Sequence, residues 1–203
     1  TVSELVRTGN NKAAADIVAR YEQFVVAEDA QSLQTLGKLK LNISGQETAG
    51  IQALEQALLL EPGQHHTRLI LAGNYIRLKQ YDKASKLADE WISTKDTEAA
   101  GYNLKALVAL LQQDMTNGKL LLAQAQAADK TNVFTHFLLA SVAQLEGDVS
   151  LADQYLKQAI ALRPDYQPAL ASYYSSLNSQ GKPEAAIQLI EQSQQSNPDN
   201  IQI

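Results

Sequence analysis

The three histidines are the side chains best suited to chemistry in this sequence, which contains no cysteine. His65 and His66 are neighbours, and adjacent side chains on a helix point about 100° apart, so this pair needs a third ligand to hold one metal ion. His136 stands alone within an apolar segment. We therefore expect His136 to be a packing or exposed side chain, and we predict no metal site.

Other catalytic patterns are absent. Serines are frequent in residues 171–179, but no G-x-S-x-G segment accompanies them, and neither of the two common glycine-rich phosphate-binding motifs occurs. Acidic pairs such as Asp89-Glu90 fall on faces that we expect to be solvated. The sequence predicts a protein that is not an enzyme, with no cofactor and no catalytic, cofactor-binding or metal-binding residue.

Charge and hydropathy exclude further classes. The formal net charge is −5 and no face rich in Lys and Arg stands out, which argues against nucleic acid as a partner. No apolar run approaches the roughly 18–20 residues that span a bilayer. The sequence begins at Thr1 without a signal-peptide pattern, so we expect a processed protein or a piece of a longer one.

The elements that position these residues are clearest in residues 133–166. Apolar or small side chains recur at helical spacing on both sides of Gly147, which supplies a flexible point, and Pro164 prevents the second helix from continuing. This helix–turn–helix unit of 34 residues recurs along the chain, although the first helix of the earliest complete unit is one residue out of step and the unit at 99–132 lacks the turn glycine. The expected units are a partial repeat at 1–30, repeats at 31–64, 65–98, 99–132, 133–166 and 167–200, and the start of a truncated repeat at 201–203.

A period of this length with two helices per unit resembles the tetratricopeptide repeat (TPR). That family has small residues where the two helices cross, because closely approaching backbones leave no room for a large side chain. The resemblance implies an all-α fold, a right-handed α-solenoid of antiparallel helix pairs over residues 1–203. The matching small residues are Ala72, Ala106 and Ala140 on first helices, and Gly50, Ala84, Gly118, Ala152, Ala186, Ala57, Ala125, Ala159 and Ser193 on second helices.

Trp91 departs from the family pattern, since it stands where a small residue is expected. Ala88, one turn earlier, stands where the other units have Leu or Ile. We interpret this as an exchange of volume within one helix face, which cores tolerate well. We therefore predict that Trp91 is largely buried.

In the TPR family the first helices line a concave groove that binds an extended peptide or a partner helix. Phe134 and Phe137 match positions in this groove, and the alternative for these two side chains is packing between adjacent units. Transferred by position, the groove residues are His66, Leu69, Arg77, Asn103, Leu107, Phe134, Phe137, Ser141, Gln144, Ser175 and Asn178, together with Gln34, Lys38, Gly73, Leu110 and Ala171.

One known TPR binding mode is not expected. Domains that hold the C-terminal carboxylate of a chaperone use a Lys and an Asn one turn apart on one first helix, and basic residues on the next first helices. The matching pairs here are uncharged, so we predict weak or no binding of acidic C-terminal peptides. These pairs are Leu69 with Gly73, Asn103 with Leu107, and Phe137 with Ser141.

The resemblance implies a protein–protein interaction scaffold, a fragment of a larger bacterial TPR protein acting in envelope assembly or secretion. The segment LGKLKLNISGQETAGIQALEQALLLEP and the many Gln and Ala residues are similar to bacterial TPR lipoproteins of the PEP-CTERM/exopolysaccharide or pilus-assembly type. That likeness implies the bacterial envelope or periplasm, with the cytoplasm as the alternative location. Two alternative functions stay open: a non-catalytic substrate-recruiting arm of a larger enzyme such as a transferase, and a structural spacer. The sequence does not identify the protein or peptide partner or the oligomeric state.

Overall fold

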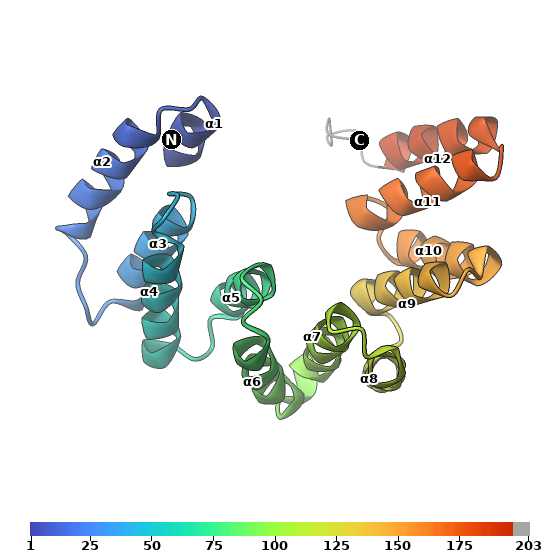
Figure 1. Ribbon diagram of the computed structural model, residues 1–203, viewed down its shortest axis with the longest axis horizontal. Helices are drawn as coiled ribbons and strands as arrows, with labels where there is room; N and C mark the ends of the chain where they lie inside the picture. The colour runs from blue at the N-terminus through green and yellow to red at the C-terminus, as the bar shows by residue number, and fades with distance from the viewer. Residues whose placement is uncertain (197–203) are drawn as a thin grey trace. The chain divides into compact units, whose positions relative to one another are not determined.

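The computed structural model describes residues 1–196, and within them the fold is all-α, as predicted (Figure 1). The chain divides into two compact units, Thr1–Ala84 and Ser85–Ile203. The predicted repeat start at 201–203, and the last residues of the unit at 167–200, lie outside the described residues. The first unit contains α1 (Val2–Arg7), α2 (Asn11–Glu22), α3 (Ala30–Leu41), α4 (Glu47–Leu60) and α5 (His65–Arg77), and α6 (Tyr81–Ile92) crosses the boundary. The second contains the 3₁₀ turn Lys95–Thr97, α7 (Glu98–Leu111), α8 (Met115–Ala128), α9 (Val133–Leu145), α10 (Val149–Leu162), α11 (Gln167–Ser179) and α12 (Pro183–Ser196).

Each turn between the two helices of a complete unit contains one residue with positive φ. Gly147 has φ 79°, and its amide together with that of Asp148 closes the end of α9 by bonding to the carbonyls of Gln144 and Ala143. At the same place in two other units, Lys79 has φ 54° and Gln113 has φ 64°. The turn geometry is thus retained where the glycine is not.

The helices of a pair cross at small residues, as the sequence predicted. A Cβ atom added to Gly50 would lie 2.9 Å from the carbonyl oxygen of Gly37 on the partner helix. Ala106 and Ala140 are buried at the equivalent crossings in the second unit. Larger side chains at these places would force the two backbones apart, at a cost of about 1–3 kcal/mol.

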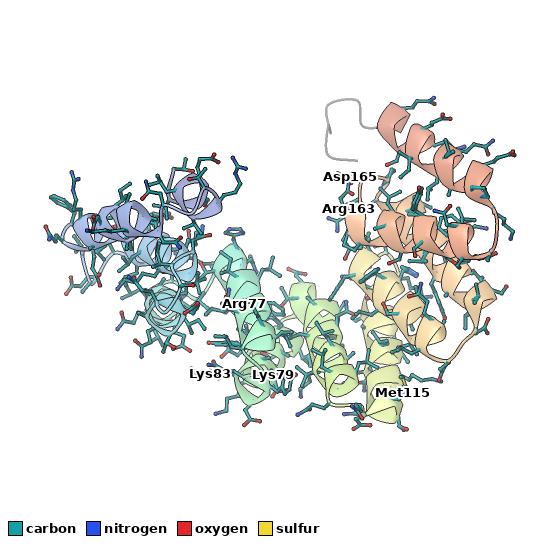
Figure 2. All side chains as sticks on the ribbon, turned by 45° about the horizontal axis from the view of Figure 1, so that its top comes forward. Arg77, Lys79, Lys83, Met115, Arg163 and Asp165 are labelled. Atoms are coloured by element: carbon teal, nitrogen blue, oxygen red, sulfur yellow. The ribbon has the colours of Figure 1, made fainter. Side chains whose placement is uncertain are left out.

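Each compact unit has its own core. In the first, Val18, Leu36 and Ala53 join α2, α3 and α4. In the second, Leu122, Leu138 and neighbouring residues form a cluster. Met115, which is labelled in Figure 2, packs against this cluster. Leu156, Ala140 and Ala169 form the next cluster along the chain. Because each cluster draws on more than one helix pair, neighbouring pairs bury the apolar faces that one pair alone leaves exposed.

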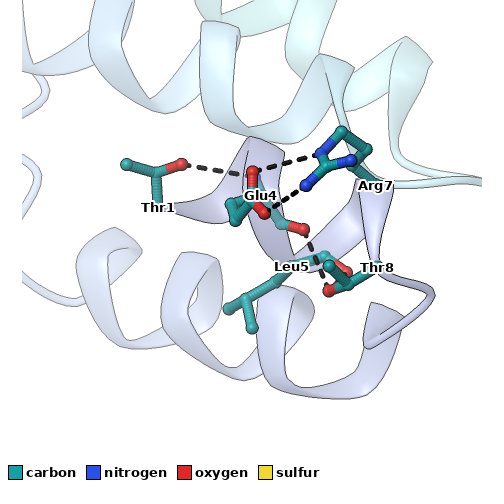
Figure 3. A network of polar contacts seen from close by, with 5 residues as sticks. All are labelled: Thr1, Glu4, Leu5, Arg7 and Thr8. Carbon is teal, nitrogen blue, oxygen red and sulfur yellow. Dashed lines mark hydrogen bonds and ion pairs between the residues drawn. The ribbon is translucent and has the colours of Figure 1, made fainter.

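Polar contacts close the first helix, α1. The Thr1 hydroxyl accepts from the amide of Glu4 at 3.2 Å, and the Glu4 carboxylate binds Arg7 Nη2 at 2.6 Å (Figure 3). The hydroxyl of Thr8 donates to the Glu4 carbonyl. The exposed pair of Glu4 with Arg7 holds the pKa of the Glu4 carboxyl below its usual range.

Trp91 is buried, with 5% of its surface exposed, and Ala88 beside it is fully buried. The predicted burial of Trp91 is therefore confirmed. The indole Nε1 of Trp91 has no hydrogen-bond partner within the described residues. Of the helices in residues 1–196, none combines the length and the apolar character needed to cross a lipid bilayer.

Candidate partner-binding surface

In the first unit, the predicted groove residues of α5 are exposed. Leu69 has 59% of its surface exposed, and His66 and Arg77 are also exposed. Arg77 donates to the Asn74 side chain at 2.9 Å. Figure 2 shows Arg77 near the turn that follows α5. This face therefore offers one large apolar side chain between polar ones.

In the second unit, the predicted aromatic centre of the groove is half-buried. Phe134 packs against the cluster that contains Leu122 and Leu138, as does Leu107. Phe137 packs against the cluster that contains Leu156. These three side chains therefore contact the core clusters and also remain partly exposed.

The two phenylalanines belong to a short aromatic row. The rings of Phe134 and Phe137 stack with centroids 6.4 Å apart, and the ring of Tyr166 meets that of Phe137 edge-on at 5.8 Å. The guanidinium of Arg163, labelled in Figure 2, lies 4.6 Å from the centroid of the Tyr166 ring. Burial raises the pKa of the Tyr166 hydroxyl, and the positive charge of Arg163 opposes that shift.

Asn103 is not a groove residue, so the prediction for it is wrong. Only 1% of its surface is exposed, which leaves a partner no access. Its amide nitrogen donates to Thr135 Oγ1 at 2.8 Å and to Asn132 Oδ1 at 3.1 Å. Asn103 instead joins α7 to the start of α9.

The first unit contains an equivalent polar junction between α3 and α5. Gln34 is only 8% exposed, so the prediction that it lies in the groove is wrong as well. It donates to Thr67, which is fully buried, and to Gln64 at 3.1 Å. Thr67 and Thr135 are separated by twice the repeat period, and so are Gln64 and Asn132. The separation of Gln34 and Asn103 is one residue longer than twice the period. This is expected, because the first helix of the unit at 31–64, which contains Gln34, is one residue out of step with the others.

Several other predicted groove residues lie on α9 and α11. Ser141 is half-buried and donates to the Phe137 carbonyl at 3.0 Å, and Asn178 is exposed. Gln144 and Ser175 line one hollow of about 520 Å³, together with Ala171. We call this the serine hollow, and its full lining is Gln144, Val149, Ala171, Ser172, Ser175, Ser176 and Ser179.

The spacing of the serines that line this hollow is visible in the sequence. Ser172, Ser175, Ser176 and Ser179 recur at intervals of three and four residues, which places them along one side of a helix. Of these four serines, only Ser175 was assigned to the groove from the sequence, and no catalytic motif surrounds the others. The structure shows them instead as the uncharged lining of an open surface.

The described residues contain no group of three or more His, Asp or Glu side chains that could hold a metal ion. His65 and His66 are exposed at the start of α5. His136 is 6% exposed, and its Nε2 donates to the Lys130 carbonyl at 2.9 Å. Its ring also lies 6.3 Å from that of Tyr155. His136 is thus a packing residue, one of the two roles expected for it.

Comparisons with known proteins agree with this architecture. Two family models, both described as tetratricopeptide repeat, match residues 42–108 and 135–166. No protein with a curated description matches the sequence.

Solved structures of TPR proteins share the fold. The chain is similar to TTC0263, a thermophilic TPR protein of Thermus thermophilus, with 21% identity and a TM-score of 0.62 over 85% of this chain and 93% of that one. It is also similar to PilW, described as a widely conserved type IV pilus biogenesis factor, with 16% identity and a TM-score of 0.59 over 98% and 92% of the two chains. MamA gives 16% identity and a TM-score of 0.53 over 78% and 93%. The helix pairs, their small-residue crossings and these matches together place the chain in the tetratricopeptide-repeat superfamily.

Proposed function

We propose that this protein is a protein–protein interaction scaffold that binds a peptide or a partner helix along the faces of its first helices. The proposal includes a single solenoid over residues 1–203, with the repeat boundaries expected from the sequence. The observation that carries it is the serine hollow, an open surface of about 520 Å³ that includes Gln144 and Ser175.

The chemistry of the serine hollow favours an uncharged segment as the occupant. Its lining consists of hydroxyl, amide and small apolar groups, with no charged side chain. Hydroxyl and amide groups can pair with the backbone of an extended peptide, whose polar groups need partners once water leaves. A carboxylate would find no cation there, which supports the expectation of weak or no binding of acidic C-terminal peptides to this face.

A role in envelope assembly or secretion, and an envelope location, belong to the same proposal. The likeness to PilW, a pilus biogenesis factor, is compatible with them, and at 16% identity it supports the fold alone. The lipoprotein and exopolysaccharide association rests on the sequence pattern of residues 36–62. A recruiting arm of a larger enzyme would use the same surface, whereas a structural spacer would bind nothing there.

Selection of binders from a random peptide library tests the proposal. The substitution Ser175→Trp fills the hollow. We expect it to lower the affinity for the selected peptides about tenfold or more, and a tenfold loss corresponds to about 1.4 kcal/mol of binding free energy. The matched control is Gln124→Trp, at an exposed position of α8 in the same unit. Titration by fluorescence anisotropy should show unchanged affinity for this control. Equal affinities for both variants, or a library that yields no binder, would contradict the proposal and favour the spacer.

A further inference from the structure

A second and larger hollow lies along α10, outside the predicted groove. It measures about 940 Å³ and runs beside α10 from Val149 to Ala161, where the turn between α11 and α12 forms its other side. The two hollows share only Val149. We call this one the α10 trough, and its lining is Val149, Ser150, Asp153, Gln154, Lys157, Gln158, Ala161, Gln180 and Lys182.

Two ammonium groups of the trough are held in place without an acidic partner. Lys157 Nζ lies 5.5 Å from the centroid of the Tyr173 ring, and Lys182 Nζ donates to Gln180 Oε1 at 2.7 Å. Neither lysine forms an ion pair with any of the residues that the structure describes. Their positive charges therefore remain available to a ligand.

The one carboxylate of the trough is already occupied. Asp153 accepts from the Ser176 hydroxyl at 2.6 Å and from Gln180 Nε2 at 2.8 Å. Gln180 thus connects Asp153 to Lys182 in one network between α10 and the turn before α12. These neutral donors satisfy the hydrogen-bonding capacity of the carboxylate but leave its charge in place, so Asp153, Lys157 and Lys182 together give the trough a net charge of +1.

The polar lining indicates what kind of chain fits. Gln154, Gln158 and Ser150 add amide and hydroxyl groups beside the two cations. From Val149 to Ala161 the helix rises about 18 Å, the length of five or six residues of extended peptide. We propose that the α10 trough is a docking surface for a short acidic segment of a partner protein, with Lys157 and Lys182 pairing its carboxylates.

A nucleic acid is the less suitable polyanion. Two lysines neutralise few phosphates, and the protein as a whole carries a formal charge of −5, which repels a long polyanion. A short acidic segment needs only local complementarity, and its binding should weaken as salt increases.

The probe is a short fluorescein-labelled peptide of alternating glutamate and serine, with a counterpart in which glutamine replaces glutamate. By anisotropy at low salt, we expect the acidic peptide to bind and the glutamine peptide to bind more weakly. The double variant Lys157→Gln/Lys182→Gln should lower the affinity for the acidic peptide about fivefold, since exposed ion pairs contribute little each.

The control variant removes the same charge elsewhere. Lys86 and Lys130 are exposed lysines of the same unit and have no ion pair within the described residues, so Lys86→Gln/Lys130→Gln should leave the affinity nearly unchanged. Ser175→Trp, which fills the serine hollow, should also have no effect, so a failure here is separable from a failure of the proposed function. Equal losses in both double variants, no binding of the acidic peptide, loss with Ser175→Trp, or tighter binding of a single-stranded DNA probe would each overturn the proposal.

Discussion

At the scale of single residues, Gln113 stands in a conformation that suits glycine. It follows α7 with φ 64°, at the place where Gly147 stands in the next unit. A residue with a side chain is strained in this left-handed region by about 1–2 kcal/mol relative to glycine. Glycine offsets part of this advantage, because it increases the conformational entropy of the unfolded chain. We expect Gln113→Gly to raise the free energy of unfolding by about 0.5–1 kcal/mol. Urea denaturation followed by circular dichroism measures this change.

A glycine one residue earlier serves as the control. Gln112 has φ −88°, so a glycine there relieves no strain and only increases the entropy of the unfolded chain. Gln112→Gly should destabilise the protein by about 0.5–1 kcal/mol. If both glycines shift stability in the same direction, the turn conformation is not the cause.

Residue types predicted the small crossing positions and the burial of Trp91, because steric exclusion acts locally and leaves few alternatives. They did not predict the burial of Asn103. Its polar side chain favoured an exposed groove position, while its burial depends on Thr135, which lies in the following repeat. A partner so distant in sequence cannot be recognised from one residue alone.

At the scale of helices, the contacts between consecutive first helices are of two chemical kinds. Gln34 with Thr67, and Asn103 with Thr135, form buried hydrogen bonds. Between α9 and α11 the corresponding place is apolar, with Phe137 against Tyr166. Buried hydrogen bonds are directional and fix how two helices meet, whereas apolar contacts tolerate small shifts. We infer that the polar junctions set the register of neighbouring pairs.

A double-mutant cycle tests the junction of Asn103 and Thr135. Either Asn103→Leu or Thr135→Val leaves a buried polar partner unsatisfied, and each should cost about 2 kcal/mol. The double variant leaves fewer unsatisfied groups, so it should cost less than the sum of the single variants by about 1 kcal/mol. Urea denaturation measures the loss in free energy of unfolding for each variant. If the losses of the two single variants add up to that of the double variant, the two side chains do not act together.

Helix boundaries were largely predictable, because the apolar periodicity recurs every 34 residues and a turn glycine or a terminal proline marks the helix ends in several units. The structure places two helices within each described complete unit, and α3 and α7 begin one residue earlier than the expected unit boundaries. The groove was predicted less well. The helical pattern predicts which side chains lie on the same face. It does not predict how deeply Phe134 is buried between neighbouring pairs, because that depends on the volumes of the residues that contact it from other helices.

At the scale of the whole molecule, the second unit has two open surfaces with different chemistry. The serine hollow is uncharged, and the α10 trough has two lysines. A scaffold with both could hold an uncharged segment of one partner and an acidic segment of the same or another partner. Linked binding of two weak segments raises overall affinity without a stronger individual site.

The central claim is that a partner protein occupies the first-helix face at the serine hollow. Photo-crosslinking in the native host tests it most directly, with a photoreactive residue placed in the full-length protein at Gln144 or Ser175 and, as controls, at the exposed Leu120 or Gln124 of α8. We predict that both hollow positions crosslink to one and the same protein and that neither α8 position does. Crosslinks to that protein from α8 alone, or no crosslinks from the hollow positions, would contradict the claim.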